Sequence, residues 1–443
     1  MARITASLSQ QRSTQVKTLI YFTVCTLFIG SVQAQTPSLD EMWDLLQTQQ
    51  MQIETLQAQL QNNQSSLSEA KTDLQVAESA LELSQNNAAQ IAETITMLEI
   101  TADAIEAGSM INRSRTQVGG YGEMHYNNLD TGNQLDFHRF VMFFSHQFRD
   151  DLSFYSELEV EHIIAGDGQP GEVEVEQAFI QWEYAPQQRL NMGVFLIPVG
   201  ILNETHEPDT FFGVERNPIE KNVIPSTWWE GGLALNGEIS PGWHYDFGLH
   251  GGLLLDTANE SASKRSNIRS ARQKVAKSNV DSLAYTGRIS YSGIPGFRWS
   301  ATLQYQSDLT QGDADGIGID TIDATLFETN VILQRGKFGL RALYARWDID
   351  DEIERLNPGS DGQFGWYIEP SITFGSGLGL FARYGLYDLT AGKSATSNER
   401  KQLELGFNYW LHDNVVFKAN YQRQDNDKGE DVDGFNLGFG YSF

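Results

Sequence analysis

Cysteine and long hydrophobic runs are both nearly missing from this chain. Its one cysteine, Cys25, lies in the only long apolar run, residues 19–29. Basic residues precede that run and Ala34 follows it, which is the pattern of a cleaved secretory signal peptide over residues 1–34. The run is too short to span a bilayer, and an uncleaved anchor is the alternative. Because the rest of the chain has no cysteine, it excludes disulfides, thiol catalysis and thiolate metal sites.

Basic charge and overall hydrophobicity are low as well. The chain has 31 Lys and Arg against 58 Asp and Glu, a formal net charge of −27. Nucleic acid is therefore excluded as a partner, because phosphate binding requires a basic face. Only 40% of the residues are hydrophobic, far fewer than a helical membrane protein needs. A transmembrane β-barrel remains compatible, because half of each strand faces a wet lumen.

The last residues alternate strictly between large apolar and small or polar side chains. Phe435, Leu437, Phe439, Tyr441 and Phe443 alternate with glycine, asparagine and serine. Because successive strand residues point to opposite faces, one face of this strand is wholly apolar. A strand that ends on an aromatic residue is typical of the closing strand of an outer-membrane barrel. The same alternation extends back to about residue 116.

A different periodicity covers residues 36–107. Leucine, isoleucine or alanine recurs every seventh residue from Leu39 to Ala102, and a more mixed series lies three residues after each. This spacing predicts a left-handed α-helical coiled coil, although the seam does not fix how many helices it contains. The alternative is one amphipathic helix that packs on its own domain.

Residues 116–443 are predicted to form an all-β transmembrane domain, a barrel of about 16 antiparallel strands. Short turns alternate with long connections, as they do in outer-membrane barrels. An even number of strands places both ends of the barrel, and with them the coiled coil, in the periplasm. The short turns lie near residues 149–151, 185–188, 241–242, 293–296, 336–337, 375–377 and 412–414, and the long connections begin near residues 127, 166, 198, 256, 309, 349, 389 and 425.

The alternation also predicts which face each side chain takes. In residues 297–306, 378–386 and 403–411, apolar residues face the lipid and polar residues face the lumen. A soluble β-sandwich would alternate too, but bulky aromatics recur at the outward strand ends, where an aromatic belt belongs. Residues 173–177 and 326–330 do not fit, because one register turns an acid toward lipid. A bulge, a position above the membrane or a subunit interface would each explain them.

The third long connection, residues 198–227, is the strongest candidate for a functional loop. It carries Phe211, Phe212 and several prolines, and a long loop without secondary structure usually has a function. Folding into the barrel would bury its apolar residues and narrow the lumen, whereas the alternative is an external loop packed on its neighbours. Its candidate pore residues are Glu204, Glu207, Asp209, Glu215, Arg216 and Lys221.

Further charged side chains are predicted to line the lumen. Ladders of charged residues are how pores select ions, and the alternative is that arginine and glutamate brace neighbouring strands. The two roles are compatible. A basic stretch in the fourth connection, residues 264–277, would attract anionic solutes or lipopolysaccharide phosphates. The inward residues are Arg139, Arg288, Arg298, Arg341 and Arg383, with Glu157, Glu159 and Glu161 on the opposite wall.

No motif in the chain predicts catalysis, a cofactor or a metal. The pair at residues 206–207 lacks the second histidine of a helical zinc site, and residues 392–394 lack the upstream glycine of a phosphate loop. Residues 313–316 resemble the start of a calcium loop without its closing acid. We therefore expect neither an enzyme nor a resident cofactor or metal.

Together these features resemble the phosphate-selective porin O and P family, and the DcaP-like porins, which also carry an N-terminal coiled coil. The most specific resemblance is the stretch from Pro198 to Glu204 continued by Ile224 to Glu230, which is similar to the family's third, constricting loop. The resemblance implies a homotrimeric diffusion channel with an inward arginine ladder. The phosphate-selective members line their constriction with lysines, whereas this loop offers only Lys221 and Arg216.

The resulting hypothesis is an outer-membrane porin of a Gram-negative bacterium for passive diffusion of small hydrophilic solutes, with anions among the candidates. The expected partners are further copies of the chain, outer-membrane lipid, lipopolysaccharide and peptidoglycan. A structural tether from the outer membrane to peptidoglycan through the coiled coil is the alternative. A trimeric adhesin is disfavoured, because the stalk precedes a complete barrel.

Overall fold

A computed structural model describes residues 115–443, except 313–318, 320, 395–397, 428 and 430, together with scattered positions between residues 47 and 75. The chain divides into two units, Met1–Asn112 and Arg113–Phe443. The described positions between 47 and 75 are helical and exposed. Most of the predicted coiled coil, and all of the predicted signal peptide, lie outside the described residues and stay predictions. No helix among the described residues has the length and apolar character to cross a membrane.

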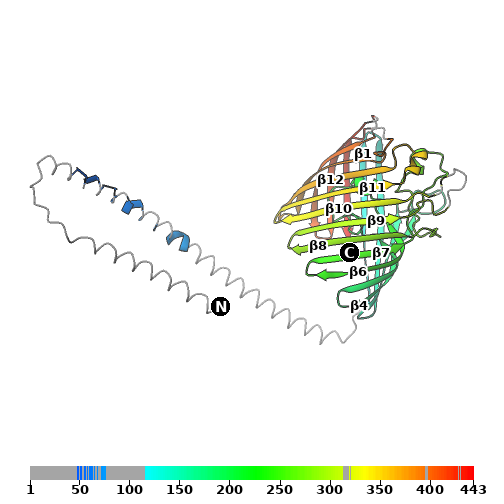
Figure 1. Ribbon diagram of the computed structural model, residues 1–443, viewed down its shortest axis with the longest axis horizontal. Coiled ribbons are helices and arrows are strands. Elements are labelled where there is room, and N and C mark those ends of the chain that lie inside the picture. Colours follow the sequence, from blue (N-terminus) through cyan, green and yellow to red (C-terminus); the bar gives the residue numbers. More distant parts are fainter. Residues whose placement is uncertain are drawn as a thin grey trace, which may run out of the picture. The chain divides into compact units, whose positions relative to one another are not determined.

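Within Arg113–Phe443 the described strands form one closed antiparallel barrel, in which each strand pairs with its neighbours in sequence and β1 pairs with β16. The predicted fold class is therefore confirmed for the barrel. The longer connections gather at one end of it (Figure 1). The sixteen strands are β1 (Thr116–Leu129), β2 (Gly132–Arg149), β3 (Leu152–Glu161), β4 (Val173–Ala185), β5 (Gln188–Leu196), β6 (Trp229–Ser240), β7 (Trp243–His250), β8 (Ala284–Ile294), β9 (Phe297–Gln306), β10 (Ala324–Arg335), β11 (Phe338–Ile349), β12 (Gly362–Thr373), β13 (Leu378–Asp388), β14 (Arg400–His412), β15 (Val415–Asn426) and β16 (Gly434–Ser442).

The alternation of side chains fixes the two faces of this barrel. On β9 and β14 the outward residues Leu303, Leu405 and Leu411 are more than half exposed, whereas their inward neighbours Thr302 and Glu404 are buried. The outer face is thus apolar and the inner face polar, as the phasing predicted. Closure uses the last residue, since the backbone amide of Phe443 donates to the carbonyl of Gly120 at 2.9 Å.

The short turns all fall where they were predicted, but the prediction of a long connection from about residue 127 is wrong. Strands β1 and β2 are joined by residues 130–131 alone, because both strands continue past the expected boundary at residue 127. Their paired residues run to Leu129 and Gly132. The alternation weakens near residue 127 because several consecutive residues there are polar, which mimics a loop.

The two segments that did not phase have a structural explanation. In β4 the register shifts opposite Glu157 and Leu158, which pair with Gln177 and Val175 and leave Glu176 as the extra residue of a β-bulge. The bulge turns Glu176 inward, where it is fully buried. In β10, Glu328 faces inward and is buried, and Phe327 faces outward. Of the three open explanations, the bulge applies to β4.

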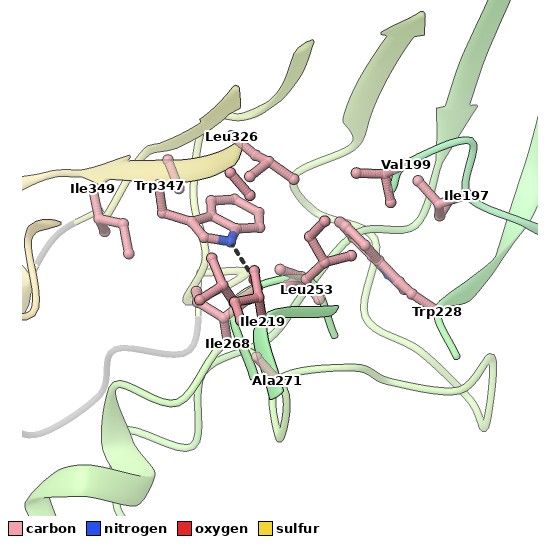
Figure 2. Packing of buried hydrophobic residues seen from close by; sticks show 14 of the residues in the cluster. Ile197, Val199, Ile219, Trp228, Leu253, Ile268, Ala271, Leu326, Trp347 and Ile349 are labelled. Atoms are coloured by element: carbon pink, nitrogen blue, oxygen red, sulfur yellow. Dashed lines mark hydrogen bonds between the residues drawn. The ribbon is translucent and has the colours of Figure 1, made fainter. Parts of the chain in front are cut away.

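Three short helical segments lie in the connections: α3 (Pro218–Asn222), α4 (Ala262–Arg265) and η1 (Asp351–Arg355). Helix α3 belongs to the third loop, defined here as residues 197–228 between β5 and β6. Ile219 of α3 belongs to the same buried apolar cluster as Trp228 of this loop and Trp347 of β11 (Figure 2). The indole nitrogen of Trp347 donates to the carbonyl of Val223 at 2.9 Å. The main apolar core therefore joins the third loop to the inner wall.

Candidate functional site

The third loop crosses the lumen and is hydrogen-bonded to the far wall. Arg341 on β11 donates to the carbonyl of Thr210 at 2.7 Å, and Arg383 on β13 donates to that of Phe212 at 2.6 Å. On β15, the side-chain oxygen of Asn420 accepts from the amide of Val214 at 3.0 Å. Because these partners lie in strands opposite the loop's own attachment points, the loop is inside the barrel. Further contacts reach Thr302 of β9, Tyr367 of β12, Asn408 of β14 and Ser442 of β16.

Lumen-facing glycines leave room for this loop. A Cβ atom on Gly385 would lie 2.6 Å from Ile219 Cδ1, and one on Gly440 would lie 2.4 Å from Pro208 Cβ. Both approaches are shorter than ordinary contacts of a Cβ atom. The same holds at Gly379, which faces Phe212 at 2.8 Å, whereas at Gly365 and Gly438 the approach to Ile219 and Val214 is 3.0 Å and a small shift of the loop side chain would relieve it.

Two water-accessible chambers lie at opposite ends of the strands. The loop-side chamber has a volume of about 890 Å³ and is lined by the third loop, by residues 131–134 and by residues of the fourth connection. The turn-side chamber has a volume of about 450 Å³ and is lined by residues next to the short turns, such as Gln187 and Glu238. Arg288 lines the second chamber and pairs with Glu204 of the third loop. The third loop therefore lines the loop-side chamber and contacts one residue that lines the turn-side chamber.

Arg216, Lys221, Arg269 and Arg272 line the loop-side chamber. Within the part of the barrel that the structure describes, none of these four cations forms an ion pair with a carboxylate. Arg269 donates to the carbonyls of Lys221 and Ser226, and Arg272 donates to that of Thr227. These bonds hold the fourth connection against the third loop.

The same cations disfavour one another's charge. Desolvation by the surrounding protein lowers the pKa of Arg269 most, and Arg272 and Arg216 add to the effect. Desolvation also lowers the pKa of Lys221, where Glu215 opposes the shift and Arg269 and Arg216 reinforce it. A cluster of repelling cations is electrostatically suited to an anion, which would stabilise all of them together.

The five predicted arginines take different environments. Arg139 and Arg383 are buried and paired with carboxylates, Arg139 with Glu123 at 2.7 Å and Arg383 with Glu369 at 2.6 Å. Buried pairs of this kind are what the bracing alternative predicts. Arg288 and Arg298 line the turn-side chamber, and Arg298 has no carboxylate partner among the described residues. Arg341 is partly exposed and binds the third loop.

The predicted acids also divide. Glu157 and Glu159 are buried, whereas Glu161 lines the loop-side chamber. In the third loop, Glu215 accepts from His125 at 3.0 Å if that ring nitrogen carries the proton, and Asp209 accepts from the hydroxyl of Ser442 at 2.7 Å. The carbonyl of Glu207 accepts from the hydroxyl of Thr210 at 2.8 Å.

Glu176, His206 and Lys418 are among the inward residues that the sequence did not predict as pore residues. Glu176 was hidden by the bulge in β4, and His206 was considered only with its neighbour in sequence. Lys418 on β15 is buried and lies 3.5 Å from the ring centre of Phe211. The alternation of β15 places Lys418 inward, which was the available signal for it.

A closed barrel with an apolar outer face and a loop folded through its lumen is the architecture of an outer-membrane porin. Residues 240–429 match the family model of Gram-negative porins. An uncharacterized protein of Aquifex aeolicus strain VF5 is 29% identical over 344 residues, which are 71% of this chain and 77% of that protein.

Solved porin structures share the fold. The anion-selective porin from Comamonas acidovorans superposes with a TM-score of 0.52 at 14% identity, covering 74% of this chain and 99% of that one. The outer membrane channel DcaP of Acinetobacter baumannii gives 0.51 at 12% identity, covering 74% and 97%. OmpF of Salmonella typhi gives 0.51 at 16% identity, covering 74% and 97%. These findings support an outer-membrane channel for solutes rather than an enzyme.

Proposed function

We propose that this protein is an outer-membrane porin through which small hydrophilic solutes diffuse passively, with the third loop as the constriction and with anions preferred. The observation that carries the proposal is the third loop itself, which crosses the lumen, lines the loop-side chamber and pairs through Glu204 with Arg288 of the turn-side chamber. Narrowing by a loop that is held to the wall is how a wide barrel acquires selectivity. The likeness to an anion-selective porin is a supporting observation at the level of fold.

Charge supports the preference for anions. The chain as a whole is acidic, with a net charge of −27, yet Arg216, Lys221, Arg269 and Arg272 gather in the loop-side chamber. Arg288 and Arg298 line the turn-side chamber. A solute that passes the third loop thus meets cations on both sides, and such local fields raise the concentration of anions.

Reversal potentials under a salt gradient test this preference. Lys221→Glu reverses one charge in the loop-side chamber, and we expect the reversal potential to shift toward cation selectivity. Lys264→Glu is the matched control, because Lys264 is an exposed residue of the fourth connection that does not line the chamber. Equal shifts in both variants, or none in Lys221→Glu, would remove the loop-side cations from the solute path.

The partners follow from the same surfaces. The apolar outer face is suited to outer-membrane lipid, and the exposed Lys264 and Lys277 are suited to lipopolysaccharide phosphates. Self-association as a homotrimer and contact of the N-terminal segment with peptidoglycan remain part of the proposal. Chemical cross-linking of the protein in native membranes measures the first, and co-sedimentation with peptidoglycan measures the second.

A further inference from the structure

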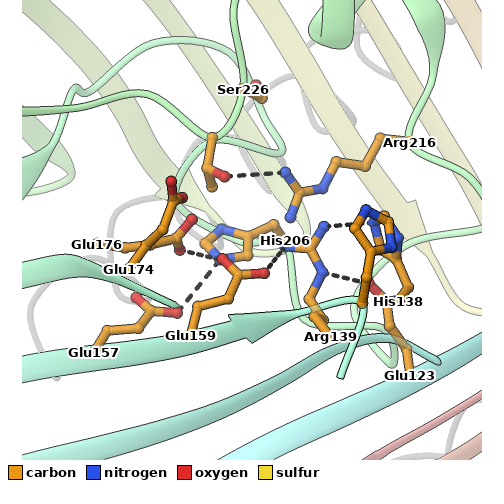
Figure 3. A network of polar contacts seen from close by, with 12 residues as sticks. Glu123, His138, Arg139, Glu157, Glu159, Glu174, Glu176, His206, Arg216 and Ser226 are labelled. Atoms are coloured by element: carbon orange, nitrogen blue, oxygen red, sulfur yellow. Dashed lines mark hydrogen bonds and ion pairs between the residues drawn. The ribbon is translucent and has the colours of Figure 1, made fainter. Parts of the chain in front are cut away.

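A buried cluster joins the third loop to β3 and β4, the strands beside β5. Glu157 on β3, Glu176 on the β4 bulge and His206 on the third loop have at most 3% of their surface exposed. His206 Nε2 lies 3.5 Å from a carboxylate oxygen of Glu157 and 3.5 Å from one of Glu176 (Figure 3). All three ligand atoms lie within 4.8 Å of one another.

These atoms are not satisfied by hydrogen bonds. A distance of 3.5 Å is longer than an ordinary N–H···O bond, which spans about 2.7–3.2 Å. His206 Nε2, Glu157 Oε1 and both side-chain oxygens of Glu176 are buried without a hydrogen-bond partner. Buried polar atoms of this kind are rare in folded proteins, and a bound ion is one of their recognised causes.

The rest of the cluster orients the three ligands. His206 Nδ1 lies 3.2 Å from the carbonyl of Asn203, and because a carbonyl only accepts, Nδ1 carries the proton. Nε2 is then the ring nitrogen that faces the two carboxylates, and a metal ion would bind through its lone pair in place of a proton. The other oxygen of Glu157 accepts from the side chain of Gln177 at 2.7 Å. A ring held by a backbone carbonyl and a carboxylate held by an amide are the usual supports of metal ligands.

The distances agree with a bound metal ion. A tetrahedral ion bound at about 2.1 Å separates its ligand atoms by about 3.4 Å, which matches the observed 3.5 Å. Glu159 lies beside the cluster and pairs with Arg139 at 3.2 Å, and Arg139 also pairs with Glu123 at 2.7 Å.

We propose that Glu157, Glu176 and His206 bind a divalent transition-metal ion, such as Zn²⁺ or Mn²⁺, that fixes the third loop to the barrel wall. One imidazole with carboxylates is a mixed nitrogen and oxygen donor set, which favours these ions over Ca²⁺ or Mg²⁺. The binding itself does not depend on transport. Its consequence for solute passage rests on the proposed function, in which the third loop is the constriction.

The test uses the full chain without a histidine tag, folded in detergent and equilibrated with Zn²⁺ or Co²⁺. After removal of free metal, elemental analysis is expected to find about one ion per chain, which a chelator removes. The visible spectrum of Co²⁺ is expected to show low coordination rather than an octahedral aquo ion. His206→Gln and Glu157→Gln are each expected to lose the ion while circular dichroism shows an intact barrel.

A second histidine group provides the control. Asp136 lies within hydrogen-bond distance of His138 and His162, so that group is already satisfied internally. The double variant His138→Gln with His162→Gln is expected to keep the ion. The proposal is overturned if the wild type retains no ion, or if the double variant loses the ion and His206→Gln keeps it. Since the wild type alone gives an answer, misfolding of a variant does not leave the proposal untested, and bound metal without channel activity would contradict only the proposed function.

Discussion

Arg383 shows how one residue holds the third loop in the lumen. Its guanidinium pairs with Glu369 at 2.6 Å and with Glu404 at 3.0 Å, and donates to the carbonyl of Phe212 at 2.6 Å. Arg383→Met would leave the buried Glu404 without its cation and Glu369 with only Arg341, at 3.9 Å. Breaking a buried pair in this way costs about 3–5 kcal/mol, which we expect to measure as a lower free energy of unfolding in denaturant titrations.

Arg423 is the matched control for that prediction. Arg423 also pairs with a carboxylate, that of Asp425, but its side chain is largely exposed to solvent. Exposed pairs contribute little to stability, so Arg423→Met is expected to unfold like the wild type. If Arg383→Met were equally stable, the buried pairs would not hold the loop.

Lys221 gives the channel a pH dependence that differs from that of an ordinary lysine. Desolvation lowers its pKa, Glu215 opposes the shift, and Arg269 and Arg216 reinforce it. Lys221 is charged below its pKa, so its charge is lost at a pH below the usual lysine value of about 10.4. We expect anion preference, measured as a reversal potential, to weaken as the pH rises toward that value, and Lys221→Gln to abolish most of this change. A wild-type preference that is constant over this alkaline range would contradict the prediction.

At the scale of elements, the fit between the third loop and the wall depends on missing side chains. Gly385→Val would drive a methyl group into Ile219 of α3, since even a Cβ atom would lie 2.6 Å from it. Overpacking of this kind costs about 1–3 kcal/mol, and we expect a lower thermal stability together with an altered single-channel conductance.

Gly287→Val is the control for this element. A Cβ atom at Gly287 meets nothing within 4 Å, so the substitution should leave both stability and conductance unchanged. Equal effects at the two glycines would mean that the cost comes from the strand and not from the loop.

The strands were predictable because their signal is local. A period of two residues is visible within any strand, and the inward positions of Arg288 and Arg298 follow from it. The bulge at Glu176 was not predictable, because an extra residue shifts the register without changing composition. The end of β1 was predicted too early for a related reason, since polar residues continue β1 and β2 beyond the apolar band.

The contacts of the third loop were beyond sequence reasoning. Arg383 and Phe212 are 171 positions apart, and no pattern in either segment names the other. The loop's apolar residues indicated that it needed a surface to pack on, and the lumen is the surface that the structure provides. His206 and Glu176 were missed for the same reason, because their proximity arises only when loop and wall meet.

At the scale of the whole molecule, an acidic protein places cations beside its internal loop. Two chambers, of about 890 and 450 Å³, lie at opposite ends of the strands, and the third loop lines the larger one and contacts Arg288 of the smaller one. The outer face carries an apolar band along the strands, so the hydrated path lies inside. The central claim is that this path conducts solutes, with anions preferred.

Single-channel recording of the purified full chain in a planar bilayer tests that claim most directly. Discrete conductance steps are expected, with a reversal potential in a salt gradient that has the sign of anion selectivity. A bilayer that contains the folded protein and shows no steps would contradict the channel, and steps with the sign of cation selectivity would contradict the role of the loop-side cations.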